Sequence, residues 1–166
     1  LLTMRTFSEE RKDGTEQLLL TAPRSVTSIV LGKFFAALIV LLIAVVLTFI
    51  YYIILMFLGN PNIKTSLVTV FGFILVSAAA ISIGMFASSI TENQVIAAIV
   101  SIAFYVITWI GTPYLSQSLE PLGLMNMFNR FGNGQIACTE VVAFISYTVL
   151  FVLLTIIVIQ RRKSVK

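Results

Sequence analysis

The sequence predicts an all-α polytopic membrane protein in which four transmembrane helices follow a polar loop. Of its 166 residues, 58% are hydrophobic and only 11% are charged, whereas soluble domains have about 25% charged residues. A soluble fold of this size cannot bury so much apolar surface. The apolar stretches are long and unbroken, so they lack the polar–apolar alternation of a transmembrane barrel. Helices are therefore expected, because only an internally hydrogen-bonded backbone is stable in lipid.

Four apolar stretches are each long enough to cross a bilayer. A hydrocarbon core of about 30 Å needs about 20 apolar residues in a helix. None of the stretches carries a charge near its centre, and turn-forming residues separate them, as in GNPNIK. The predicted spans cover residues 31–58, 65–90, 93–115 and 140–160.

A mixed segment, residues 113–139, separates the last two predicted spans. Prolines and glycines interrupt it, while leucines, methionines and a phenylalanine keep it apolar. This combination predicts short helices at the membrane interface. Glu140 at the end of this segment and Glu92 in the turn between two spans are interpreted as solvated helix ends.

Positive charge gathers at the two ends of the chain. Nine of the eleven Lys and Arg residues precede residue 34 or follow residue 160. Four crossings place both ends on one side, and the positive-inside rule makes that side cytoplasmic. Residues 161–166 are then a cytoplasmic tail, and 113–139 is extracytoplasmic. The same rule accounts for the net charge of +4, so nucleic acid is not expected as a partner.

The only long polar segment lies ahead of the first complete span. Residues 6–12 predict a short charged helix, and Asp13-Gly14 predicts a break after it. Thr15 can cap a second short helix that bears three leucines, and Ser25 can cap the helix that enters the membrane. Such a segment suits the docking of a soluble partner, and an interfacial linker is the alternative.

Small residues recur at helical spacing in the second predicted span. Ala80, Gly84 and Ser88 are four residues apart, so they share one helix face. Small side chains allow a second helix to approach closely. Packing within the chain is favoured here over an interface between subunits.

Several stretches resemble the permease subunits of bacterial type-2 ABC exporters. They are FSEERKDGTEQLLLTAPRS with the following IVLGKFFAAL, then IGMFASSITENQVIAA, and the closing VIQRRK. The resemblance covers essentially the whole chain and is most specific in the first polar segment. Because the family has six helices, it implies that this chain lacks the first helix and most of the second. The four spans would then be equivalent to helices three to six.

The resemblance also implies which function each subunit has. The permease would form the substrate path of an ATP-driven exporter in the bacterial cytoplasmic membrane, while a separate ABC ATPase subunit binds ATP and Mg and hydrolyses the ATP. A second permease copy or paralogue and membrane lipid would be the other partners. Residues 5–30 would be the cytoplasmic loop, with a coupling helix that transmits ATPase motion. The docking residues would be Glu9, Glu10, Gly14, Thr15, Glu16, Leu18, Leu19 and Leu20.

The sequence offers no set of residues for catalysis. It has no histidine, and no P-loop, HExxH, CxxC or GxSxG motif occurs in it. We therefore expect a protein that is not an enzyme and that binds no cofactor or metal itself. The absence of charge near the centres of the spans disfavours a proton-coupled carrier. The alternative function is a non-transporting membrane anchor or assembly subunit that recruits a soluble partner.

Overall fold

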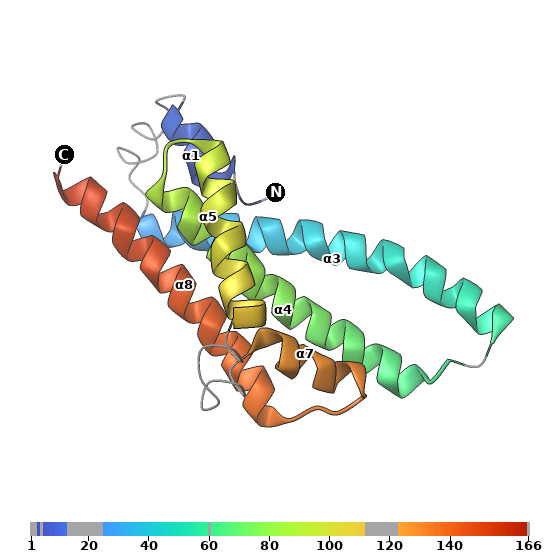
Figure 1. Cartoon of the computed structure of the whole chain (residues 1–166). Coiled ribbons are helices and arrows are strands. Elements are labelled where there is room, and N and C mark those ends of the chain that lie inside the picture. The colour runs from blue at the N-terminus through green and yellow to red at the C-terminus, as the bar shows by residue number, and fades with distance from the viewer. Residues whose placement is uncertain (1–2, 4, 13–24, 60, 112–122, 166) are drawn as a thin grey trace.

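The structure, a computed structural model, describes residues 3, 5–12, 25–59, 61–111 and 123–165. This part of the chain is helical and contains no β-strand (Figure 1). The elements in chain order are α1 (Arg5–Lys12), α3 (Val26–Leu58), α4 (Ile63–Ile90), α5 (Gln94–Val106), the π-helix η1 (Ile107–Gly111), α7 (Leu124–Gly132) and α8 (Cys138–Val165).

Three of the described helices are long and apolar enough to cross a membrane, namely α3, α4 and most of α8. This finding confirms the predicted class, an all-α polytopic membrane protein. The third predicted span, 93–115, begins where expected, but its apolar helix at Gln94–Trp109 is shorter than the other three. A π-helical turn follows α5, and residues 112–122 lie outside the described part.

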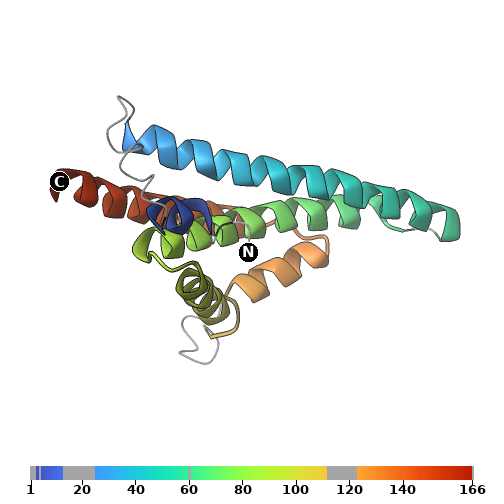
Figure 2. The same ribbon diagram turned by 90° about the horizontal axis from the view of Figure 1, so that it is seen from above.

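The helix α4 is central to the fold. It packs most extensively against α8 and also contacts α1, α3, α5 and α7. Figure 2 shows α3 on one side of α4, with α5 and α7 on the other. Its buried stretch consists mostly of Ala, Ser and Gly, which let neighbouring helices approach its backbone. The buried hydroxyls of Ser82 and Ser89 donate to carbonyls of their own helix, so they need no acceptor from a neighbour.

The short helix α7 lies in the segment for which interfacial helices were predicted. It is amphipathic and buries Leu124, Met127 and Phe131 against α4 and α8. Gly72 of α4 leaves space for the Phe131 ring, because a Cβ atom at position 72 would lie 2.6 Å from Cγ of Phe131. After α7 the chain turns at Gly134, whose φ of +75° favours glycine.

Glu140 is buried, so the prediction of a solvated helix end is wrong for this residue. Its side chain is only 4% exposed. One carboxylate oxygen accepts from Nη1 of Arg130 at 3.0 Å, and the other accepts from the backbone N–H of Ala137 at 3.2 Å. These partners, together with the positive end of α8, compensate for the loss of water around the carboxylate. Glu92 is exposed, as predicted.

The helix α3 is the least covered of the long helices. Near its start, Val26, Val30, Phe34 and Ala37 pack against α4 and α8. Further along, most of its large apolar side chains are exposed. With 33 residues it is about 50 Å long, which exceeds the hydrocarbon core of about 30 Å.

The close contact between α4 and α7 generates a test of the packing. We expect Gly72→Ala to lower the free energy of unfolding by about 1–3 kcal/mol, the usual effect of overpacking a core. The measurement is thermal unfolding in detergent, followed by circular dichroism. The matched control is Gly32→Ala on α3, where a Cβ atom meets nothing within 4 Å and alanine favours the helix. Equal stability of the two variants would contradict this packing.

Candidate functional site

The helix α1 lies across the end of the bundle where α3 begins and α4 ends. Phe7 of α1 enters a buried apolar cluster that includes Val30 and Phe34 of α3, Met85 of α4 and Ile156 of α8. Phe7 thus shares one buried cluster with residues of all three long helices. We call this end of the molecule the α1 end, and the opposite end, where α3 is followed by α4, the turn end.

A serine of α4 supplies the N-terminal hydrogen bonds of α1. The hydroxyl oxygen of Ser88 accepts from the backbone N–H groups of Phe7 and Ser8, at 3.0 Å each. The first N–H groups of a helix have no acceptor within that helix, so a side chain from elsewhere can satisfy them. Ser88 is completely buried. This contact fixes the start of α1 on α4.

Gly84 lies one turn before Ser88 and leaves room for the chain that precedes α1. A Cβ atom at this glycine would collide with the hydroxyl of Thr3 and lie 2.9 Å from its Cβ. Ala80, one turn earlier again, is half-buried. Gly84 and Ser88, two of the three small residues predicted for helix packing, therefore contact the chain's own N-terminal segment.

Lys33 of α3 binds α1 from a second side. Its ammonium group pairs with the carboxylate of Glu10 and donates to the carbonyl of Thr6 at 2.5 Å. The same nitrogen lies 4.2 Å from the ring centroid of Phe7, a favourable cation–π distance. Both members of the ion pair are mostly covered, so water screens their attraction less than that of a surface pair.

Arg11 ties the other end of α1 to the end of α4. Its guanidinium pairs with Glu92 at 2.5 Å and donates to the carbonyl of Ile90 at 3.3 Å. Arg162 of α8 donates to the same carbonyl at 3.2 Å. Cations are stabilised at a helix C-terminus, so this end of α4 joins α1 to α8. We call the residues that hold α1 the α1 seat: Lys33, Gly84, Ser88, Ile90 and Glu92.

The structure describes only part of the predicted docking segment. Glu9 is exposed, whereas Glu10 is engaged by Lys33. The predicted charged helix is present as α1, and Ser25 caps α3 as predicted by accepting from the N–H of Ser28. The remaining predicted docking residues lie outside the described part of the chain; they are Gly14, Thr15, Glu16, Leu18, Leu19 and Leu20.

Sequence reasoning missed the contributions of Lys33 and Arg11 to this site. A signal existed for Lys33, because a lone lysine inside an apolar helix indicates an acidic or carbonyl partner nearby. The described residues contain no group of three or more His, Cys, Asp or Glu that could hold a metal ion. The described contacts of this site fasten the short helix α1 to α3 and to the end of α4.

The sequence matches a known family of membrane proteins over nearly its full length. Residues 1–164 match the family described as ABC-2 family transporter protein. No curated protein and no solved structure matches the chain. The matched region includes the whole α1 seat and the three long helices.

The double hydrogen bond to Ser88 generates a test of the α1 seat. We expect Ser88→Ala to weaken the attachment of α1 by about 1 kcal/mol, as loss of a helix N-cap does. Amide hydrogen exchange should then be about fivefold faster at Phe7 and Ser8. The control is Ser146→Ala, because that residue is exposed and its hydroxyl donates to the carbonyl of Val142 within α8. Unchanged exchange in the Ser88 variant would show that the cap does not hold α1.

Proposed function

The chain belongs to the ABC-2 family of transporter proteins, and we propose that this ABC-transporter permease works as an ATP-driven exporter. Membership in the family implies an ABC ATPase as a partner. In the proposal, the ATPase subunit binds ATP and Mg, and the permease forms the substrate path. Residues 13–24 receive the motion of the ATPase.

The observation that carries this proposal is that α1, which directly precedes residues 13–24 in the chain, is firmly attached to α3 and α4. These residues join the end of α1 to Ser25, the cap of α3. On one side, α1 is held by α3, by the end of α4 and by the turn before α5. On the other side, the chain continues directly into α3. In the proposal, a displacement of residues 13–24 therefore reaches α3 directly and reaches α4 through α1.

The charge distribution supports the orientation that we propose. The described cations at the α1 end include Arg11, Lys12, Arg161, Arg162 and Lys163. At the turn end, Lys64 and Arg130 are the described cations, and Arg130 is paired with Glu140. By the positive-inside rule, this asymmetry supports a cytoplasmic position of the α1 end, on the side where ATP is available. We propose the bacterial cytoplasmic membrane, with a second permease copy or paralogue and lipid as further partners.

The direct test measures ATPase stimulation in lipid vesicles, using the intact permease and its ATPase subunit. We expect Leu18→Asp to weaken binding of the ATPase about thirtyfold, the effect of losing an interface hot spot of about 2 kcal/mol, and to abolish stimulation. Gly14→Pro should also abolish it. The control Gln135→Asp adds the same charge in an exposed loop at the turn end. Stimulation that persists in both loop variants would contradict the proposal, and partner binding without cargo flux would favour a membrane anchor.

A second test separates the α1 seat from the docking surface. We expect Glu10→Gln to reduce the stability of the permease by about 1 kcal/mol, because it removes the partner of Lys33. Glu9→Gln is the matched control, because this neighbouring carboxylate is exposed and its loss should leave the melting temperature unchanged. Both variants should lower ATPase affinity if residues 9 and 10 contact the ATPase. Equal melting temperatures would contradict the role of Glu10 in the seat.

A further inference from the structure

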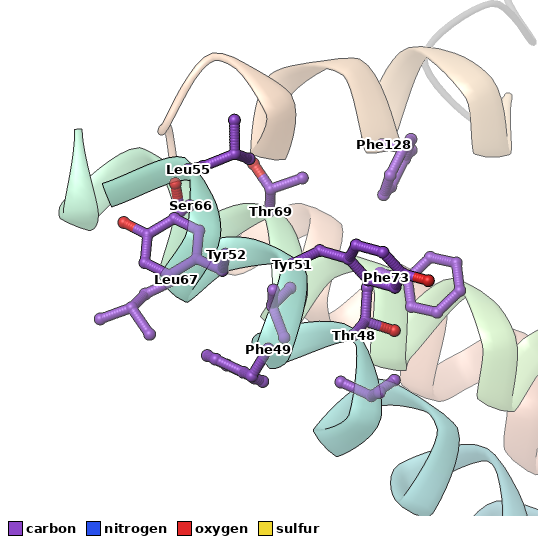
Figure 3. A pocket seen from close by; sticks show the side chains of 12 residues that line it. Thr48, Phe49, Tyr51, Tyr52, Leu55, Ser66, Leu67, Thr69, Phe73 and Phe128 are labelled. Atoms are coloured by element: carbon purple, nitrogen blue, oxygen red, sulfur yellow. The ribbon is translucent and has the colours of Figure 1, made fainter. Parts of the chain in front are cut away.

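An apolar groove lies at the turn end between the last part of α3 and the first part of α4 (Figure 3). Its volume is about 380 Å³, within the range of about 300–1,000 Å³ that is typical of small-molecule sites. Phe128 of α7 closes one part of it. The other walls come from α3 and α4, and they include Thr48, Tyr51, Tyr52, Leu67, Val70 and Phe73.

Tyr52 brings an unused hydrogen-bond donor to this groove. Its hydroxyl is buried and has no hydrogen-bond partner among the residues that the structure describes. Buried hydroxyl groups are normally paired, so an acceptor from a bound molecule would complete this one. Tyr52 lies six residues before Leu58, the last residue of α3, which is about 9 Å along the helix axis. The Tyr52 residue that carries this hydroxyl therefore lies inside α3 and not at its end.

Described positive charge lies at the start of α4, beside the groove. Lys64 lies one turn before Leu67, on the same side of α4, and its side chain is exposed. The N-terminus of α4 adds a partial positive charge. Glu140, the described carboxylate at the turn end, is paired with Arg130. An anionic group is thus favoured at the start of α4, beside an apolar groove.

We propose that this groove binds one acyl chain of an anionic phospholipid from the leaflet at the turn end. Both helices that form the walls are long enough to span the membrane, so acyl chains are the molecules that surround the groove. The phosphate lies at Lys64 and the start of α4, an ester carbonyl accepts from Tyr52, and the chain follows α3 toward Thr48. The inference is independent of the export proposal, because it concerns only the permease and its lipid.

The test uses a phospholipid with a photoactivatable group in its acyl chain. The intact permease is placed in vesicles that contain this probe either as phosphatidylglycerol or as phosphatidylcholine, without the ATPase, and labelled peptides are mapped by mass spectrometry. We expect labelling of residues 45–55 and 66–73 to exceed that of the exposed positions of α8, and to be stronger for phosphatidylglycerol. Lys64→Gln should reduce this headgroup preference about fivefold, the contribution of one lysine near an anionic surface.

Two further variants separate a specific site from general contact with lipid. Tyr52→Phe keeps the ring and removes the hydroxyl, so labelling of the groove should fall about fivefold, as expected for one hydrogen bond. Val70→Phe fills the groove, whereas the control Val149→Phe makes the same change at an exposed position of α8. We expect Val70→Phe to remove the labelling of the groove and Val149→Phe to leave it intact.

Three results would overturn the proposal. The first is equal labelling of the groove and of exposed α8, with no response to Tyr52→Phe or Val70→Phe. The second is protection of the groove from the probe together with disulfide-linked dimers of Leu67→Cys in a Cys138→Ser background, which would assign the groove to a second copy. The third is loss of labelling only during ATP turnover with the ATPase subunit, which would assign it to a transported amphiphile.

Discussion

The fold depends on how closely other elements can approach the backbone of α4. Lipid chains are as apolar as the helices, so the hydrophobic effect does not drive the helices together. Close van der Waals packing between helix surfaces must hold them instead. In each half of α4, a glycine leaves a space that a side chain from another part of the chain fills. Phe131 fills the space over Gly72, and Thr3 fills the space over Gly84. The same property of one helix thus organises the α7 region and the α1 seat.

Polar side chains follow a second rule, which is that each buried charge lies beside its partners. Lys33 is paired with Glu10, and Glu140 is paired with Arg130 and with a backbone N–H group. Removing a charge from water is unfavourable unless the protein replaces the lost hydrogen bonds. These pairs therefore fix where α1 and the start of α8 can lie. The Tyr52 hydroxyl is different, because the described residues give it no partner although it is buried.

The helices and their order were predictable from the sequence because apolar length and turn residues are local signals. The Ser25 cap was predictable for the same reason. The partners of Ser88 were not, because they are backbone N–H groups 80 and 81 residues away. The burial of Glu140 depends on Arg130, which lies in a different helix. Spacing along the chain does not reveal that the two side chains meet. The family resemblance predicts a docking loop in residues 5–30, and residues 13–24 of it lie outside the described part of the chain.

The length of α3 has a mechanical consequence. It is a single continuous rod of 33 residues that is held firmly near its start and packed lightly beyond it. In such a rod, a rotation of about 5° at the α1 end moves the far end by about 4 Å. The far end carries Tyr51 and Tyr52, which form walls of the groove. A small angular change of α3 at the α1 seat would therefore be amplified into a change of groove width at the turn end.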